Sequence, residues 1–198
     1  ISLLRLIPNA NNEVLNGKWR QHIGSLLTGK TIGIIGCGNI GKDLVEILIN
    51  FNCRILAYDI KNYNEFYDLH NIEPVDLETL LIMSDVVSLH VPLNNSTRNI
   101  LNSNNLCLMK ATSILINTAR GGLVDEIALK VQLKNRSIAA AAFDVFNEEP
   151  PKDFELLHLE NFFVTPHIAG SAQESILAMG KSAIDGLDNN FIPEKNFE

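Results

Sequence analysis

The sequence TIGIIGCGNIG occupies residues 31–41 and joins a short apolar run to three glycines in the pattern G-x-G-x-x-G. The run from Thr31 to Ile35 predicts a buried strand, and the residues after the glycines predict a helix. Between them, Gly36 permits a tight turn, Gly38 lets the backbone approach a pyrophosphate, and Gly41 lets the helix pack closely on the strand. The free N–H groups of a helix N-terminus also attract anions. This stretch is therefore typical of a dinucleotide-binding turn.

A second apolar run, from Arg54 to Tyr58, leads directly to Asp59. This acid follows the third glycine by about 20 residues, the spacing at which a carboxylate accepts a hydrogen bond from a ribose 2′-OH. Because a carboxylate repels a 2′-phosphate, Asp59 favours NAD over NADP as the cofactor. The alternative is a structural glycine-rich turn with a solvated aspartate, which the strand-turn-helix context disfavours.

Short apolar runs alternate with helical patterns along the rest of the chain. Near-continuous apolar strands separated by helices indicate a parallel sheet that helices cover on both faces. We therefore predict an α/β fold, a doubly wound parallel sheet of the Rossmann type. The expected strands are 31–35, 54–58, 85–91, 113–117, 138–143 and 162–164, and the expected helices are 39–50, 76–83, 124–133 and 171–190. The first of these helices should bury a face made of Ile40, Leu44, Ile47 and Leu48.

The last expected helix carries signals of its own. Ser171 and Glu174 fit a capping box at its start. An apolar stripe follows, made of Ile176, Met179, Ala183, Ile184 and Leu187. We expect residues 1–170 to form the NAD-binding domain and residues 171–198 to form a C-terminal helix and tail.

The composition limits the possible partners. A net charge of −7 without a Lys/Arg block argues against nucleic acid. No apolar run approaches the roughly 20 residues that cross a membrane, and the start from Ile1 to Ile7 lacks the features of a signal peptide. Cys37, Cys53 and Cys107 are odd in number, far apart and in apolar surroundings. This predicts reduced, buried thiols in a cytoplasmic protein and no metal site.

Residues 117–126 read NTARGGLVDE and follow an expected strand. Arg120 lies between the strand end and two glycines, in the crevice where such folds bind ligands. Its planar fork suits a carboxylate, and its charge can polarise a carbonyl. A lone arginine more often forms a surface salt bridge, but the glycines and the strand end favour a functional role. We expect Asp125 and Glu126 to complement the dipole of the helix that follows.

Two further segments follow expected strands, AFDVFNEEP at residues 142–150 and TPHIAGS at residues 165–171. A histidine bonded to a glutamate has a raised pKa and can exchange a proton near neutral pH. The interconversion of a hydroxyl and a carbonyl needs such a group, and His167 is the candidate. Helix capping or a core hydrogen bond is the alternative for His167, and a solvated turn is the alternative for Glu148 and Glu149.

Together these four ordered motifs resemble the D-isomer-specific 2-hydroxyacid dehydrogenases, which include phosphoglycerate, glycerate, D-lactate and formate dehydrogenases. The resemblance covers nearly the whole chain. It implies an NAD-dependent oxidoreductase that transfers hydride between NADH and a 2-oxo acid, giving a D-2-hydroxy acid, with a 3-phosphoglycerate-like substrate as one option. Its catalytic residues would be Arg120, which binds the 2-oxo acid, His167, the proton donor, and Glu149, which supports His167. Glu149 is preferred to Glu148 because the family's glutamate directly precedes proline, here Pro150.

The resemblance also implies the cofactor contacts. Beyond the three glycines these are Asn39 and Ile40 at the turn, Asp59 on the ribose, and His90, Val91 and Pro92 along the dinucleotide. Thr118, Ala119 and Arg120 would lie near the nicotinamide, Asp144 would hold its carboxamide, and the stretch with His167, Ala169 and Gly170 would close the site.

The family builds its substrate domain from an N-terminal stretch and a C-terminal tail, and this chain begins inside the helix that enters the cofactor domain. We therefore expect a truncated chain that lacks most of its substrate domain, whose own turnover the missing loops would limit. The C-terminal helix would return toward that domain. Gly17, Lys18 and Trp19 resemble part of the family's dimer-forming segment, which implies a homodimer.

Two other interpretations stay open at this point. Relatives with this fold act as NAD-sensing corepressors and can keep the Arg-Glu-His trio, but a long disordered tail and a peptide-binding cleft, which would favour that role, are not evident. Another Rossmann enzyme, such as a homocysteine hydrolase-like protein, is disfavoured by the NTARGG and TPHIAG segments.

Overall fold

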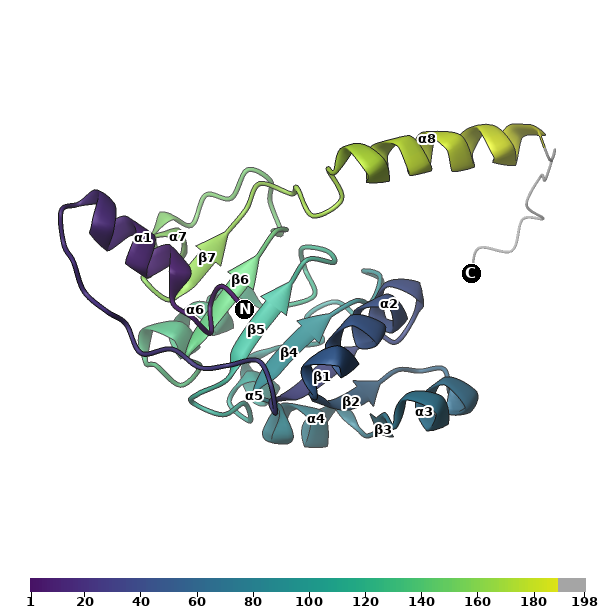
Figure 1. The fold of residues 1–198 in the computed structure, drawn as a ribbon, viewed down its shortest axis with the longest axis horizontal. Coiled ribbons are helices and arrows are strands. Elements are labelled where there is room, and N and C mark those ends of the chain that lie inside the picture. The colour runs from purple at the N-terminus through teal and green to yellow at the C-terminus, as the bar shows by residue number, and fades with distance from the viewer. Residues whose placement is uncertain (189–198) are drawn as a thin grey trace. The chain divides into compact units, whose positions relative to one another are not determined.

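The computed structural model describes residues 1–188, which divide into two compact units (Figure 1). The first unit, Ile1–Pro166, contains a seven-stranded sheet in the order β3-β2-β1-β4-β5-β6-β7. Every pairing between these strands is parallel. The strands are β1 (Thr31–Ile35), β2 (Arg54–Tyr58), β3 (Glu73–Pro74), β4 (Val86–Leu89), β5 (Ile114–Asn117), β6 (Ala140–Phe143) and β7 (Phe162–Val164). The predicted doubly wound fold is confirmed.

Helices connect the strands. In the first unit they are α1 (Ile7–Leu15), α2 (Asn39–Leu48), α3 (Asn64–His70), α4 (Leu77–Met83), α5 (Ser103–Leu106), α6 (Glu126–Lys134) and α7 (Phe154–Leu157), and a 3-10 turn (Ile49–Phe51) extends α2. The sequence predicted helical character at the start of the chain, and α1 lies there but is short. Helices α3, α5 and α7 and strand β3 were not predicted. Each is short or weakly patterned, so the apolar period is seen only once or twice.

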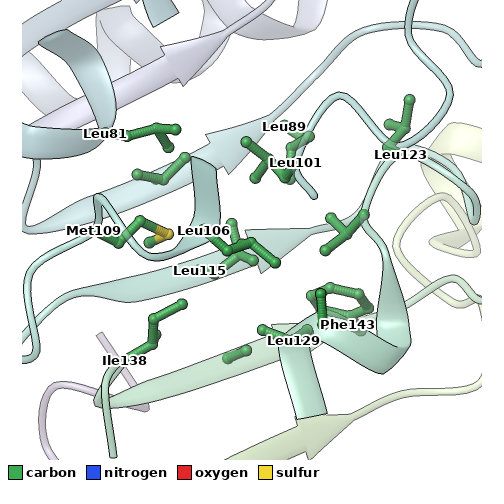
Figure 2. Packing of buried hydrophobic residues seen from close by; sticks show 14 of the residues in the cluster. Leu81, Leu89, Leu101, Leu106, Met109, Leu115, Leu123, Leu129, Ile138 and Phe143 are labelled. Carbon is green, nitrogen blue, oxygen red and sulfur yellow. The ribbon is translucent and has the colours of Figure 1, made fainter. Parts of the chain in front are cut away.

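The core lies on both faces of the sheet. On one face, side chains of β4, β5 and β6 pack against α4, α5 and α6, and Figure 2 shows Leu89, Leu115 and Leu129 in this layer. On the other face, Ile32 and Ile34 of β1 pack against α2 and α3. Because successive strand residues point to opposite faces, burial on both sides explains the nearly unbroken apolar runs in the sequence.

The buried face of α2 matches the predicted one only in part, since Leu48 is buried and Leu44 packs against the core as expected. Ile40 and Ile47 are 69% and 58% exposed, whereas Gly41, Val45 and Leu48 are buried. The rotation of the helix is set by Gly41, whose backbone lies against the Gly36 carbonyl. A Cβ built on Gly41 would stand 2.2 Å from that oxygen. The apolar periodicity predicted the helix correctly, but the contact between Gly41 and the Gly36 carbonyl determines which side chains face the sheet.

The prediction of three buried thiols was wrong in part. Cys37 is buried and Cys53 is half-buried, but Cys107 is exposed. Cys107 follows α5, a single-turn helix at the surface, and its thiol donates to the Asn104 carbonyl at 3.3 Å. Within residues 1–188 all three cysteines are free.

The second unit begins at His167 and contains α8 (Gln173–Asp188). The helix starts two residues after Ser171. Ala172, which has no side-chain acceptor, directly precedes it, so the predicted cap at Ser171 was wrong by one position. Glu174 lies in its first turn. The predicted end of this helix, Asn189 and Asn190, lies outside the described residues. No helix found in residues 1–188 combines the length and apolarity needed to span a membrane.

Candidate cofactor site and active site

The register of the sheet brings the predicted site residues of the first unit to one edge. Ile35 of β1 pairs with Tyr58 of β2 and with Leu89 of β4. The residues that follow these three strand ends are Gly36, Asp59 and His90. Strand order reverses at β1, between β2 and β4, and open α/β sheets bind ligands in the crevice at such a switch point.

The same register continues across the sheet. Leu89 pairs with Asn117, Asn117 with Phe143, and Phe143 with Val164. The residues that follow the last three of these strand ends are Thr118, Asp144 and Thr165. The predicted cofactor residues of the first unit therefore share the carboxyl edge of one sheet.

Each glycine of the turn has a different environment. Gly36 has a φ of 96°, and a Cβ there would lie 2.8 Å from the His90 carbonyl oxygen. Gly41 is closed off by the Gly36 carbonyl, as described above. Gly38 is different, because a Cβ there would meet nothing within 4 Å. Gly38 also precedes α2 and supplies no side-chain cap. The turn thus presents open space at the N-terminus of a helix, where an anion is stabilised.

Asp59 is held firmly beside this turn. Its Oδ2 accepts from the Cys37 backbone N–H at 2.7 Å, and its Oδ1 accepts from the Lys61 N–H at 2.8 Å. Each carboxylate oxygen keeps a further lone pair for a hydroxyl donor. A carboxylate fixed in this way is preorganised to bind a ribose.

Cys37 serves the turn as a small buried side chain. Burial raises the pKa of its thiol, and the neighbouring Tyr67 hydroxyl, a hydrogen-bond partner, lowers it. Burial also raises the pKa of the Tyr67 phenol. Both groups are therefore neutral at physiological pH, and Tyr67 of α3 contacts the turn through the Cys37 side chain.

His90 lies just beyond β4, at the switch point. Its Nε2 lies 2.9 Å from the hydroxyl of buried Ser88. Burial lowers the pKa of the imidazole, so the ring is neutral at physiological pH. The backbone of His90 and the side chain of Val91 press against Gly36. These residues therefore shape the wall of the glycine turn, and Pro92 continues the same loop.

Arg120 is carried by a turn that Asn117 closes. The Asn117 amide donates to the Arg120 carbonyl at 2.9 Å, and its Oδ1 accepts from the Ala119 N–H at 3.1 Å. The Arg120 side chain is exposed, and its Nη1 donates to the Ala119 carbonyl at 2.6 Å. Sequence reasoning missed Asn117 as the organiser of this turn. An Asn at a strand end, three residues before the arginine, is the signal that could have indicated it.

Glu149 lies on the next loop, which touches the Arg120 turn. Its Oε1 accepts from the Phe146 backbone N–H at 3.1 Å. Glu148, by contrast, pairs with Lys152 at the surface. A Cβ on Gly121 would stand 1.9 Å from the Phe146 carbonyl oxygen. The backbones of the two loops are therefore in direct contact, which only glycine allows.

Asp144 is buried beyond β6, only 3% exposed. The Thr165 hydroxyl donates to its Oδ1 at 2.5 Å. A buried carboxylate needs such donors because its desolvation is costly. Asp144 is thus a fixed acceptor at the carboxyl edge of the sheet, as a contact for a carboxamide requires.

His167, Ala169 and Gly170 belong to the second unit, where His167 has a φ of 55° and the Ser171 N–H donates to the Ile168 carbonyl at 2.9 Å. The structure therefore brings together the loops of Arg120 and Glu149, whereas the pairing of His167 with Glu149 stays a prediction. Within residues 1–188, no group of three or more His, Cys, Asp or Glu side chains is arranged to hold a metal ion.

The first unit fits a dinucleotide on three counts: open space at Gly38, the N-terminus of α2, and the fixed carboxylate of Asp59. Residues 1–169 match the family described as D-isomer specific 2-hydroxyacid dehydrogenase, NAD binding domain. The chain belongs to this family. The family predicted from the four sequence motifs is thereby confirmed, together with NAD as the cofactor of its domain.

The sequence of the chain is similar to those of several oxidoreductases. Over 183 residues it is 42% identical to D-3-phosphoglycerate dehydrogenase of Methanocaldococcus jannaschii, a match that covers 91% of this chain and 35% of that protein. It is 40% identical over 192 residues to hydroxypyruvate reductase of Thermotoga maritima, covering 94% of this chain and 62% of that protein.

Among solved structures, D-lactate dehydrogenase with NAD+ from Lactobacillus jensenii has a TM-score of 0.88 to this dehydrogenase domain at 31% identity. That match covers 98% of this chain and 65% of the other. The chain thus spans between 35% and 65% of the length of these relatives.

Proposed function

We propose that this chain is the cofactor-binding part of an NAD-dependent D-2-hydroxyacid dehydrogenase that interconverts a 2-oxo acid and a D-2-hydroxy acid. The observation that carries the proposal is the carboxylate of Asp59, fixed on the glycine turn by the Cys37 N–H. Family membership supports the reaction class. When bound, NADH supplies the hydride that reduces the carbonyl carbon.

The chain's own residues divide the remaining work. Arg120 binds the substrate carboxylate and polarises the carbonyl, because a guanidinium donates two parallel hydrogen bonds and keeps its charge. His167 gives a proton to the carbonyl oxygen as hydride arrives at the carbon. Glu149 orients His167 and stabilises its protonated form. Asn117 holds the Arg120 turn, which supports a fixed position for the guanidinium.

The substrate is proposed to be a three-carbon or smaller 2-oxo acid. The relatives of this chain are named for 3-phosphoglycerate, hydroxypyruvate, glycerate and glyoxylate. A 3-phosphoglycerate-like substrate is therefore compatible with the similarity. Comparing hydroxypyruvate, phosphohydroxypyruvate and glyoxylate by kcat/KM in the full-length protein would decide among them.

The first experiment is a fluorescence titration of the chain with NADH and NADPH, repeated with Asp59→Ala. Tight NADH binding, weak NADPH binding and loss of NADH binding in the variant are the expected results. Absence of NADH binding by the wild-type chain would contradict the proposal. Catalysis is then tested in the full-length protein with His167→Ala, for which we expect a drop in kcat of about 10²-fold or more.

We further propose that the protein forms a homodimer through the segment before β1. Trp19 and Ile23 are 87% and 98% exposed there, and aromatic side chains are enriched where protein surfaces pair. Light scattering should therefore report a dimer for the wild-type chain and a monomer for Trp19→Glu. A wild-type monomer would contradict this proposal. The cytoplasmic location expected from the cysteines stays a prediction.

A further inference from the structure

Glu126 is a half-buried acid whose position a helix-dipole role does not explain. It is the first residue of α6, but the N-terminus of that helix is already capped. Asp125 Oδ1 accepts from the N–H groups of Ile127 and Ala128, both at 3.0 Å. The capping function of the two acids therefore belongs to Asp125, and Glu126 is free to bind elsewhere.

The Glu126 carboxylate reaches the loop that carries Glu149. Its Oε1 accepts from the Asn147 backbone N–H at 2.7 Å. The preceding N–H, that of Phe146, donates to Glu149. Two consecutive amides of one loop are thus held by two carboxylates, one from α6 and one from the loop itself.

The setting of Glu126 makes this contact costly to form. Burial raises the pKa of its carboxyl, the Asn147 N–H opposes the rise, and the nearby Asp153 and Asp125 add to it. A charged side chain placed among other acids in a partly buried position gives up solvation. The hydrogen bond to Asn147 is the compensating interaction that the structure shows.

The loop that carries Glu149 contacts the Arg120 turn on one side and borders a pocket on another. The backbone of Gly121, next to Arg120, lies against the Phe146 carbonyl. A pocket of about 520 Å³, lined in part by Glu126, Asn147, Glu148 and Asp153, borders the same loop. The loop is therefore not fully packed on the side of this pocket. Glu126 supplies an anchor at the residue next to the contact with Gly121.

We propose that Glu126 is a positioning residue, which holds the loop of Glu149 against the turn of Arg120 by accepting the Asn147 N–H. This inference rests on the proposed function for the roles of Glu149 and Arg120. Only an acceptor is needed at this position, so Gln should replace Glu, whereas Ala should not. Glu148 is the matched control, since it lies in the same loop and pairs only with exposed Lys152 among the contacts described.

The kinetic test compares Glu126→Ala, Glu126→Gln and Glu148→Gln in the full-length protein with NADH and hydroxypyruvate or glyoxylate. We expect Glu126→Ala to lower kcat by about tenfold or more, the equivalent of one lost hydrogen bond. Glu126→Gln and Glu148→Gln should stay within about threefold, and the Kd for NADH should be unchanged in all three. Unchanged kcat in Glu126→Ala would overturn the proposal, as would an equal loss in Glu126→Gln.

A second test reads the loop directly and does not need turnover. Amide hydrogen exchange measured by NMR should accelerate by about tenfold or more in Glu126→Ala at both Asn147 and Phe146. It should accelerate at neither in Glu126→Gln. Acceleration at Asn147 alone would overturn the proposal, because Glu149 would then hold its place without Glu126. If Glu126→Ala does not fold, Glu126→Asp, whose side chain is too short to reach Asn147, replaces it with the same expectations.

The two tests separate the inference from the proposed function. A wild-type protein that binds NADH but reduces none of the 2-oxo acids would contradict the proposed function. The exchange measurement alone then decides whether Glu126 holds the Glu149 loop.

Discussion

The carboxylate of Asp59 accepts a hydrogen bond from the backbone N–H of Cys37, with Oδ2 and N 2.7 Å apart. The bond joins the end of β2 to the middle of the glycine turn that follows β1. It exists because Ile35 and Tyr58 are paired in the sheet, so the two chain segments leave the sheet side by side. The acid that would recognise the ribose therefore also stabilises the turn that would hold the pyrophosphate.

Replacing Asp59 separates these two roles. Asp59→Asn keeps an oxygen for the Cys37 N–H but removes the charge, whereas Asp59→Ala removes both. We expect the Kd for NADH to rise by about tenfold in Asp59→Asn and further in Asp59→Ala, because hydrogen bonds to charged groups are the stronger ones. The preference for NADH over NADPH should narrow in both, since the repulsion of a 2′-phosphate is gone. Fluorescence titration with each nucleotide measures these changes.

Equal binding of NADH by the wild type and Asp59→Ala would contradict this assignment. Glu46→Gln, at an exposed position on α2, is a suitable control because it removes one charge away from the turn. It should leave both nucleotide affinities unchanged.

Gly38 and Gly41 should respond to alanine in opposite ways. Gly38→Ala adds a methyl group to open space, so its effect on unfolding should be below about 1 kcal/mol. The same methyl group occupies the place where a pyrophosphate approaches, and the Kd for NADH should rise by about tenfold or more. Gly41→Ala instead forces the methyl group against the Gly36 carbonyl, and should destabilise the fold by about 1–3 kcal/mol.

Thermal unfolding without nucleotide and NADH titration distinguish the pair. A marked loss of stability in Gly38→Ala, or none in Gly41→Ala, would show that the glycine environments are assigned wrongly.

The predictions from the sequence were most accurate for strands whose ends are marked by the residues next to them. The bounds of β1 and β2 match the expectation because each apolar run is closed by glycine or aspartate. The stripe of α2 was predicted correctly at Leu44 and Leu48 and wrongly at Ile40 and Ile47. The Gly41 backbone contact, which periodicity does not record, fixes how the helix is turned on the sheet.

The sequence did not reveal those roles in the site that depend on hydrogen-bond partners distant along the chain. Asp125 and Glu126 look alike in sequence, as two acids at a helix start. Only the fold places Asn147 beside Glu126 and leaves capping to Asp125. In the same way, the sequence distinguishes Glu149 from Glu148 only by the proline that follows Glu149. In the fold, Glu148 pairs with Lys152, whereas Glu149 accepts a hydrogen bond from the backbone of its own loop.

His90 should make the stability of the protein depend on pH. Burial lowers its pKa below the ordinary 6.5, so the folded chain binds fewer protons here than the unfolded chain as the pH falls below that value. The free energy of unfolding is therefore higher above about pH 6.5, where His90 is neutral in both states. It falls as the pH drops from there toward the pKa of the folded protein. In His90→Gln this part of the pH dependence should disappear. Thermal unfolding at several pH values from about 8 to about 5.5 tests this, and parallel curves for both proteins would contradict it.

Arg120 should not tolerate replacement by lysine. Asn117 closes the backbone turn that carries Arg120, and the exposed Arg120 side chain donates from Nη1 to the Ala119 carbonyl. Lysine keeps the charge but loses both the plane and the paired donors that match a carboxylate. If the proposed reaction is correct, Arg120→Lys in the full-length protein should lower kcat/KM by about 10²-fold while leaving the Kd for NADH nearly unchanged. Arg136→Lys, on an exposed arginine that pairs with Glu160, is the matched control and should have no effect. An Arg120→Lys variant as active as the control would contradict this role, because a positive charge without the planar pair of donors would then suffice.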